Sequence, residues 1–500
     1  MKLTRDARLY LAVAGCAVVV YAGALWNRFA LDDGPIIALN PLVQAPSGLW
    51  QAFLHPYWAP IDGGHLYRPL AVATYALDRL LGGPPWFHLV NVFWHAGASV
   101  AVAALARRWA GERSALVAGL LFAVHPVHVE AVANVAGRAD LMAALFSALA
   151  VYAAVARGSL GWSVLAFALG LLSKESAVVV PALIVWGWLV GLARPSRPRV
   201  VAFGICWAVV AAAYVALRTA VLGSPTGPLH IAPVFLGAGS VAVRLTAIAA
   251  FTDVARLLVF PLTLRADYSP AERTLVTLLW DGRLLLGVAC LAAWGALLAL
   301  AWRRARRVEA MALGWIAIAL LPVANLVIPV GILVAERTLY LPSMGAVIAF
   351  ATWLERSPVP RPAFVLGLLV LAGAARTALR VPVWRDDKSV TLSIIEDSPR
   401  SYRGPVYAGL MLQAARRPDR ALEYYRIAFA IYPRDSRLLI GAADAAFALG
   451  RSALADSLLR QAEPLCREQC ATNYSNQANA ARERGDSVVA ESLSAWVRSP

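Results

Sequence analysis

Long apolar runs, separated by short basic connections, determine the fold class of this chain. A helix of about 20 apolar residues is long enough to cross the hydrocarbon core of a membrane. With 60% hydrophobic and 15% charged residues, the chain is too apolar for a soluble protein of 500 residues. We therefore predict an all-α, polytopic transmembrane bundle with about eleven crossings. The apolar runs lie near 9–25, 88–106, 114–124, 140–156, 160–173, 177–193, 199–217, 241–262, 283–302, 310–334, 343–354 and 364–380.

Basic residues predict how these runs are oriented. Lys2, Arg5 and Arg8 precede the first run, and further clusters occupy the connections near 107–113, 194–199, 303–307 and 355–361. Because basic connections stay on the cytoplasmic side, we expect a cytoplasmic N-terminus and a retained signal anchor in a bacterial inner membrane. The same clusters explain much of the net charge of +16, so we predict no nucleic-acid partner.

One apolar run is expected not to span. The run 241–262 contains Arg244, Asp253 and Arg256, which are costly in hydrocarbon but acceptable at the outer interface. Without it, the crossings are odd in number and the chain leaves the membrane on the outer side after about Val381. The outer side then also receives the loops 26–87, 125–139, 174–176, 218–282 and 335–342.

The C-terminal hundred residues are more polar and show a period typical of tetratricopeptide repeats. Ala421 is followed by Ala455 after 34 residues and by Ala490 after a further 35, and small residues at such positions let two helices approach closely. We therefore predict three parts, a membrane domain over 1–381, a linker over 382–401 and a repeat domain over 402–500. About two and a half repeats are few, so we expect them to pack on neighbouring parts. A generic helical hairpin domain is the alternative. The other residues of the period are Gly409, Tyr425, Ala428, Pro433, Gly450, Leu459, Ala462 and Gly485.

Cysteines are few in the chain. Cys466 and Cys470 are four residues apart on an expected helix. This spacing is near the geometric limit for a disulfide, so a bridge and a pair of free thiols are both open.

Polar residues that could carry chemistry stand in the exterior loops. Asp32 and Asp33 follow the first crossing and can serve as a general base, as metal ligands or as a solvated loop. In the string from His125 to Asp140, the residues Glu130, Asn134 and Arg138 recur at helical spacing. A polar stripe of this kind is either interhelical contact or a substrate cavity.

The same string raises the question of a metal. His125, His128 and Glu130 are close enough in sequence to suggest zinc, but no HExxH or CxxC motif accompanies them. We therefore predict no metal site, although a divalent ion remains possible.

Further charges lie at Lys174–Glu175 and Glu336–Arg337, each between two apolar runs. In one interpretation the neighbours within each pair only neutralise each other. In the other, Arg138, Lys174 and Arg337 share one membrane face and hold phosphate groups.

Several of these strings together resemble the transmembrane and tetratricopeptide-repeat O-mannosyltransferase family and its bacterial relatives. The similarity extends over essentially the whole chain. It is carried by Asp32-Asp33, Tyr67-Arg68-Pro69-Leu70, the string His125–Asp140, Leu172-Ser-Lys-Glu175, Glu336–Ser343 and the repeats. The resemblance implies the C-type membrane glycosyltransferase superfold, a polyprenyl-phosphate-linked sugar as donor, no required cofactor, and an acidic catalytic residue in the first exterior loop.

The resemblance also assigns roles. Asp32 or Asp33 would be the general base in an inverting transfer to an acceptor hydroxyl on a protein or glycan, with the repeats recruiting the acceptor. Arg138, Lys174 and Arg337 would hold the lipid phosphate. The remaining binding residues that it implies are His125, His128, Glu130, Tyr340, Arg68 and Glu175. The family usually has more repeats than this chain.

Two other functions stay open from the sequence alone. A transporter or flippase for a lipid-linked intermediate would also expose charges to an anionic headgroup, although such proteins tend to show inverted repeats, which we do not find. A non-catalytic scaffold would recruit envelope proteins through its repeats, and it would tolerate loss of Asp32 and Asp33.

Overall fold

The structure, a computed structural model, describes residues 4–58, 66–225, 231–358, 361–466 and 470–498. These residues form helices and irregular segments with no strand among them, which confirms the prediction of an all-α fold. The membrane part contains α1 (Arg5–Tyr21), α4 (Pro69–Leu81), α5 (Pro84–Ala110), α6 (Glu112–Val124), α7 (Val129–Ala133), α8 (Arg138–Val151), α9 (Leu160–Ser173), α10 (Val180–Leu189), α11 (Arg197–Leu222), α12 (Ser240–Ala249), α13 (Phe251–Val259), α14 (Gly282–Arg303), α15 (Arg307–Leu320), α16 (Tyr340–Arg356) and α17 (Pro362–Arg380).

Six helical stretches of the described chain are long and apolar enough to cross a membrane. They are Arg5–Trp26, Pro84–Ala110, Val135–Ala156, Arg197–Leu222, Gly282–Arg303 and Pro362–Trp384. A seventh is the bent pair Glu112–Val124 and Pro126–Ala133, and two shorter apolar helices cover Leu160–Ser173 and Glu175–Leu189. Several crossings of such a bundle can be shorter than a full span, so the count of about eleven stays a prediction.

The bend of 48° in the seventh stretch has a local cause. Pro126 has no backbone N–H, and its ring disfavours helical geometry in the preceding residue. His125 is accordingly extended and ends α6. The polar string that follows therefore folds as short, broken helices at one end of the bundle.

The basic connections gather at the other end of the bundle. Arg5 Nε lies 2.6 Å from Glu112 Oε1, and Arg356 forms an ion pair with Glu309. Arg307 lies beside Gly191, which joins the connections near 191 and 307. The predicted orientation requires the basic connections to lie on one side of the membrane, and their position at one end of the bundle is consistent with this requirement.

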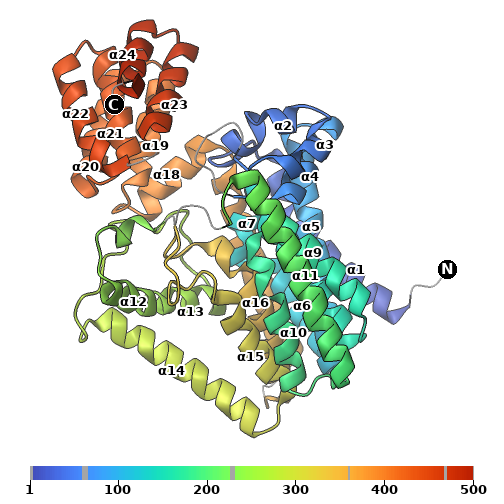
Figure 1. Cartoon of the computed structure of the whole chain (residues 1–500). Helices are drawn as coiled ribbons and strands as arrows, with labels where there is room; N and C mark the ends of the chain where they lie inside the picture. The colour runs from blue at the N-terminus through green and yellow to red at the C-terminus, as the bar shows by residue number, and fades with distance from the viewer. Residues whose placement is uncertain (1–3, 59–65, 226–230, 359–360, 467–469, 499–500) are drawn as a thin grey trace.

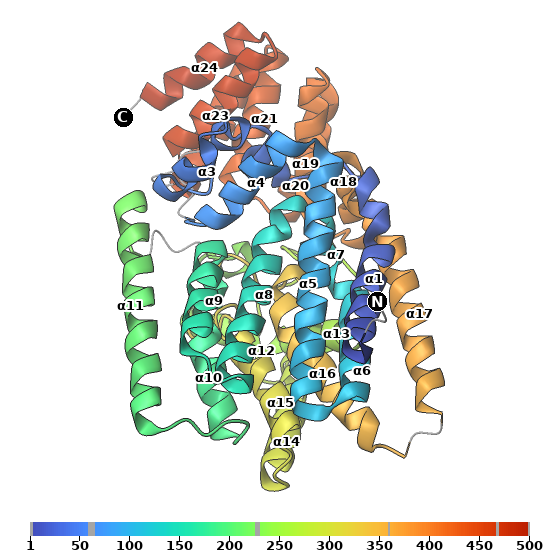
Figure 2. The same cartoon turned by 90° about the vertical axis from the view of Figure 1, so that its right-hand side faces the viewer.

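The run 241–262 forms the two short helices α12 and α13, of 10 and 9 residues. Figures 1 and 2 show them lying across the direction of the bundle helices. Neither is among the stretches that are long enough to span, in agreement with the expected interfacial position.

The C-terminal part lies above the end of the bundle that carries the polar string (Figure 2). The segment expected to be a linker contains a helix, α18 (Asp387–Asp397), after which consecutive helices pack in three pairs. Gly409 shows why small residues recur there, because a Cβ at this position would lie 2.6 Å from the ring of Tyr425. The domain limits and the repeat class remain predictions, and the side chains of Cys466 and Cys470 lie outside the described residues. The paired helices are α19 (Arg403–Ala414), α20 (Pro418–Ile431), α21 (Ser436–Ala448), α22 (Ser452–Cys466), α23 (Cys470–Glu483) and α24 (Ser487–Arg498).

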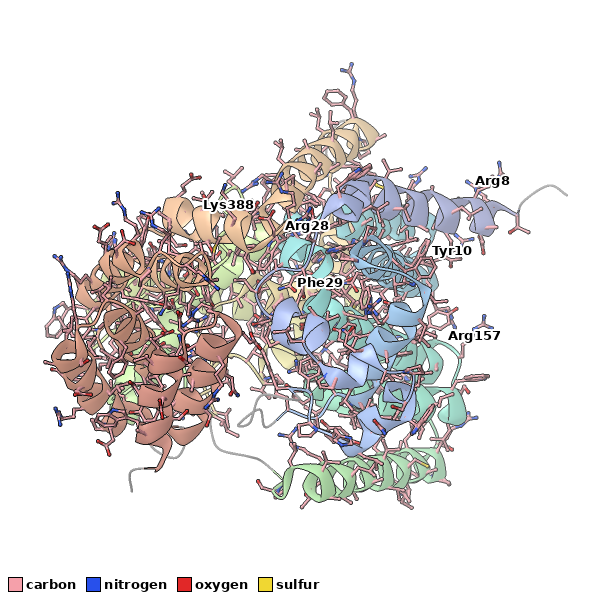
Figure 3. The ribbon with its side chains drawn as sticks, turned by 90° about the horizontal axis from the view of Figure 1, so that it is seen from above. Arg8, Tyr10, Arg28, Phe29, Arg157 and Lys388 are labelled. Carbon is pink, nitrogen blue, oxygen red and sulfur yellow. The ribbon has the colours of Figure 1, made fainter. Side chains whose placement is uncertain are left out.

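The first exterior loop follows α1 and contains the short helices α2 (Pro41–Gln44) and α3 (Gly48–Gln51). Seen from above, Arg28 of this loop lies near Lys388 of α18 (Figure 3). Two hydrogen bonds donated by main-chain N–H groups of this loop fix the approach. Arg28 donates its N–H to the carbonyl of Arg385 at 2.7 Å, and Leu31 donates its N–H to Asp387 Oδ1 at 2.6 Å.

Candidate active site

Asp32 and Asp33 have different environments. Asp33 is fully buried, and its carboxylate accepts the backbone N–H groups of Ala30 at 3.2 Å, Val135 at 3.3 Å and Ala136 at 2.7 Å. Burial raises the pKa of the Asp33 carboxyl to about 7, against these hydrogen bonds, which lower it. Asp33 thus joins the first exterior loop to the polar string, whereas Asp32 has 42% of its side chain exposed.

A pocket opens beside Asp32. Three of the predicted residues line it, Asp32, Glu130 and Arg337. They come from the first exterior loop, from α7 and from the turn Glu336–Leu339 that precedes α16. The remaining lining residues are Leu31, Asn134, Arg265, Ala266, Asp267, Tyr268, Ile332, Val334, Ala335, Trp384, Ile394, Arg403 and Tyr407.

Arg337 is held in this pocket by Glu130. Its backbone N–H donates to Glu130 Oε2 at 2.9 Å and its Nη1 donates to Glu130 Oε1 at 3.0 Å. Nη1 also lies 3.9 Å from Asp32 Oδ2. Because Glu130 is buried and occupied on both oxygens, the arrangement presents one fixed cation next to one accessible carboxylate.

Lys174 and Arg68 lie beyond the lining of this pocket. Lys174 Nζ is 2.7 Å from both carboxylate oxygens of Asp140. Arg68 binds Glu175 through two hydrogen bonds, of 3.0 Å from Nε and 2.5 Å from Nη2. The charged residues therefore pair across segments, and the interpretation that neighbours within Lys174–Glu175 and Glu336–Arg337 neutralise each other is wrong.

Arg138 is fully buried in the bundle. Its guanidinium lies 2.5 Å from Asp78 Oδ2 and donates to Asn91 Oδ1 at 2.7 Å and to the carbonyl of Phe87 at 2.9 Å. It also lies over the ring of Tyr75, 4.8 Å from the centroid. Since its donors are used and no solvent reaches it, we do not include Arg138 among the residues proposed to bind phosphate.

The expected aromatic and imidazole residues are buried away from the pocket lining. His128 contacts Ser343 Oγ at 2.8 Å through Nε2 and the carbonyl of Phe122 at 3.0 Å through Nδ1. Tyr340 contacts His95 at 2.8 Å, and His125 Nε2 lies 3.2 Å from the carbonyl of Leu258. Within the described residues, no group of three or more His, Cys, Asp and Glu side chains could hold a metal ion.

The sequence reasoning missed the opposite side of the pocket. Arg265, Asp267 and Tyr268 line this side and belong to the loop 218–282, for which the sequence predicts only an exterior position. Glu336 accepts the N–H of Arg265 at 2.5 Å and the hydroxyl of Tyr268 at 3.0 Å. Burial raises the pKa of Glu336 to about 8. Arg403 and Tyr407 stand in α19, where the repeat pattern gave no reason to expect them at the site.

Comparison with known proteins places this geometry in a family context. A family model described as dolichyl-phosphate-mannose-protein mannosyltransferase matches residues 87–222. The chain is 29% identical to Protein O-mannosyl-transferase TMTC4 of Homo sapiens over 495 residues, which cover 83% of this chain and 65% of that protein. A shorter stretch of 183 residues is 38% identical to Protein O-mannosyl-transferase Tmtc2 of Drosophila melanogaster, covering 32% of this chain and 19% of that protein.

Among solved structures, the apo crystal structure of the Archaeoglobus fulgidus oligosaccharyltransferase matches 76% of this chain and 56% of its own, with 13% identity and a TM-score of 0.44. This chain spans between about half and two thirds of the length of the first curated relatives, 65% and 55% for the two human proteins TMTC4 and TMTC1. As the motifs predicted, the chain is a relative of the transmembrane and tetratricopeptide-repeat protein O-mannosyl-transferases.

Proposed function

We propose that this protein is a membrane glycosyltransferase that moves a hexose from a polyprenyl-phosphate donor to an acceptor hydroxyl. The observation that carries the proposal is the meeting of Asp32, Glu130 and Arg337 in one pocket, although Glu130 and Arg337 are 207 residues apart. The names of the relatives favour mannose as the sugar and a protein hydroxyl as the acceptor.

Asp32 is the general base of the proposed reaction. Its carboxylate removes the proton from the acceptor hydroxyl while that oxygen attacks the anomeric carbon of the sugar. The bond from that carbon to the phosphate oxygen breaks, and polyprenyl phosphate leaves with inversion at the carbon. Asp33 is the poorer candidate because three backbone N–H groups occupy its buried carboxylate.

Arg337 supports departure of the phosphate. A guanidinium fixed by Glu130 is already oriented when negative charge develops on the leaving group, so no reorganisation is needed at that moment. Lys174 and Arg68 lie outside the lining of this pocket and are paired with Asp140 and Glu175, so Arg337 is the one of these three cations that we assign to the phosphate. A phosphate leaving group needs no acid and no cofactor.

The proposed reaction takes place on the outer face of a bacterial inner membrane. The pocket lies at the end of the bundle opposite to the basic connections, which the positive-inside rule assigns to the cytoplasm. The N-terminus is then cytoplasmic and the repeat domain periplasmic. In that compartment the repeats can recruit the acceptor, and the lipid donor enters from the membrane.

The test is release of polyprenyl phosphate from a panel of polyprenyl-phosphate hexoses by purified protein. Asp32→Asn should lower the turnover about 100-fold or more, because a general base contributes about that much. Asp419→Asn is the matched control, since Asp419 is exposed on α20 and pairs with Arg417 at the surface. Adding EDTA to the wild type tests the open question of a divalent ion.

Three outcomes separate the alternatives. Loss of release only in Asp32→Asn supports the glycosyltransferase. Unchanged release in that variant contradicts Asp32 as the base. Absence of release from every donor, with the lipid crossing the bilayer of proteoliposomes, contradicts the enzyme and favours a flippase.

A further inference from the structure

One side of the pocket is built by residues at the end of the last candidate span, Pro362–Trp384, and beyond it. Trp384 follows α17, Ile394 belongs to α18, and Arg403 and Tyr407 belong to α19. The first helix of the expected repeat domain therefore contributes directly to the cavity that contains Asp32.

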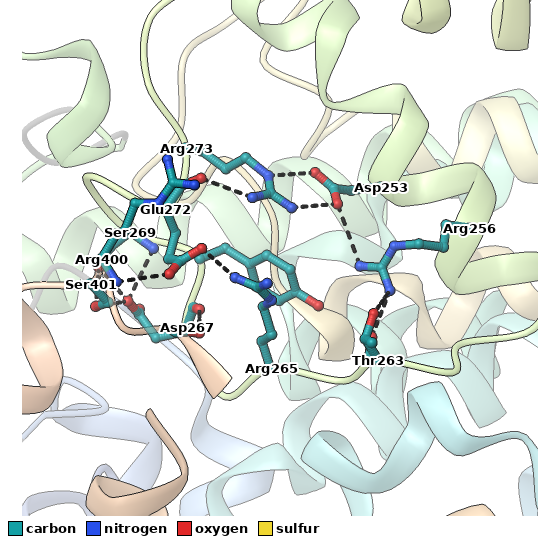
Figure 4. Close-up of polar contacts among 12 residues, drawn as sticks. Asp253, Arg256, Thr263, Arg265, Asp267, Ser269, Glu272, Arg273, Arg400 and Ser401 are labelled. Carbon is teal, nitrogen blue, oxygen red and sulfur yellow. Dashed lines mark hydrogen bonds and ion pairs between the residues drawn. The ribbon is translucent and has the colours of Figure 1, made fainter. Parts of the chain in front are cut away.

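The loop 265–272 holds the beginning of α19 in this position. Asp267 Oδ2 accepts the hydroxyl of Ser401 at 2.6 Å, and Asp267 Oδ1 lies 3.3 Å from Arg403 Nη1. Main-chain hydrogen bonds run from Ala271 N–H to the carbonyl of Arg400 at 2.6 Å and from Tyr402 N–H to the carbonyl of Pro270 at 3.1 Å. Figure 4 shows part of this network, with Arg400 and Ser401 beside Asp267, Ser269 and Glu272.

Trp384 brings an unused hydrogen-bond donor to the pocket. Its side chain is 3% exposed, and its indole N–H has no hydrogen-bond partner in the part of the chain that the structure describes. A buried N–H group without a partner costs free energy. Its presence at the lining of a cavity points to a ligand that accepts this hydrogen bond.

Tyr407 brings a second donor, near Asp32. Within the described residues its hydroxyl forms no hydrogen bond that would occupy it, and the residue lines the same cavity. Burial raises the pKa of the Tyr407 hydroxyl, and the carboxylates of Asp32 and Asp267 raise it further, against the effect of Arg403. The hydroxyl therefore stays protonated at neutral pH and is able to donate.

We propose that Trp384 and Tyr407 bind the hexose ring of the donor, with Arg403 as a positioning residue that fixes α19 through Asp267. This inference rests on the proposed function. A hexose offers hydroxyl oxygens to the two donors and an apolar face to the aromatic rings. Its anomeric carbon is one oxygen atom away from the phosphate, so the ring must lie close to Arg337, which lines the same cavity as Trp384 and Tyr407. The repeat domain is then part of the donor site as well as a recruiter of acceptors.

The experiment compares two lipids that differ only in the sugar. The affinities of a short-chain polyprenyl-phosphate mannose and of the same polyprenyl phosphate without sugar are measured for wild type, Tyr407→Phe and Trp384→Phe. Each variant removes one donor and keeps the aromatic ring. Each should weaken binding of the sugar-bearing lipid about three- to tenfold, the usual effect of one hydrogen bond, and leave the bare lipid unchanged. Tyr424→Phe on α20 is the matched control outside the pocket and should alter neither affinity.

The outcomes separate this inference from the function on which it rests. Equal weakening of both lipids, or no change in either variant while the wild type turns over the donor, overturns the sugar site and leaves the enzyme in place. A wild type that binds both lipids equally and releases no polyprenyl phosphate from the sugar-bearing lipid overturns the proposed function itself. If Trp384→Phe folds poorly, the variant Tyr407→Phe still gives a decisive result, because Tyr407 is only half-buried.

Discussion

Replacing Arg138 with Met should destabilise the protein strongly without a specific effect on the donor. The substitution leaves Asp78, whose side chain is 4% exposed, as a buried carboxylate without its partner. It also removes the donors to Asn91 Oδ1 and to the carbonyl of Phe87. The resemblance to the family assigned Arg138 to the lipid phosphate, so this residue separates a structural role from a binding role.

The size of the effect follows from these contacts. Breaking a buried ion pair by removing one partner costs about 3 to 5 kcal/mol, and an orphaned carbonyl adds about 1 kcal/mol or more. Arg138→Lys should cost less because the charge on Asp78 stays compensated, although the planar fork to Asn91 and Phe87 is lost. The double variant Arg138→Met with Asp78→Leu should recover most of the loss, since it leaves no unpaired buried charge.

Thermal unfolding in detergent measures these differences, and donor affinity is measured on each variant well below its melting temperature. We expect the order of stability to be wild type, then Arg138→Lys, then Arg138→Met, with the affinity of the folded fraction for polyprenyl phosphate close to that of the wild type. An Arg138→Met variant that melts like the wild type but no longer binds polyprenyl phosphate would refute the structural role.

Four further predictions concern other parts of the molecule. Asp33→Asn should lower the free energy of unfolding by about 1 to 3 kcal/mol, because its amide places an N–H group against a backbone N–H; an unchanged melting temperature would contradict this. Burial raises the pKa of Glu336 from 4.5, the usual value for this side chain, to about 8. The stability of the protein should therefore decline as the pH rises from about 4.5 to about 8. Glu336→Gln should remove this decline from a plot of melting temperature against pH, and an unchanged plot would contradict the buried, protonated carboxyl. Asp267→Ala should free the beginning of α19, seen as faster limited proteolysis between the two parts of the chain, and equal cleavage rates would count against the contact. In a cysteine-free background, Lys388→Cys should react with a membrane-impermeant maleimide from the periplasm and Arg304→Cys only after permeabilisation, and the reverse pattern would invert the topology.

The helical fold was predictable because its signals are local. Apolar runs identify membrane helices from a window of about 20 residues, and Pro126 identifies the break at which α6 ends and the short helices of the polar string begin. The prediction that 241–262 does not form a spanning helix followed in the same way, from three charges that are costly in hydrocarbon, and neither α12 nor α13 is long enough to span. The number of crossings is harder to predict, because helices such as α9 and α10 are shorter than a full span.

The candidate site was predictable only in part, because the sequence gives residue types but not their partners. Asp32, Glu130 and Arg337 meet in the pocket as their shared exterior position suggested. Arg138 has the same residue type and the same predicted face as Arg337, but its partner carboxylate, Asp78, is 60 residues away in the sequence, and no local pattern connects the two. The residues on the far side, Trp384 and Tyr407, carry no charge and belong to segments interpreted as a linker and a repeat.

The C-terminal helix pairs and the composite pocket depend on the same contacts with the membrane part. The chain is fixed to the membrane part just before and just after the first C-terminal helix pair, α19 and α20. Ser398 and Ser401 donate to Asp267, and the hydroxyl of Tyr432 donates to the carbonyl of Pro233 at 2.9 Å. The contacts that stabilise these helix pairs are the same contacts that bring Arg403 and Tyr407 to the pocket.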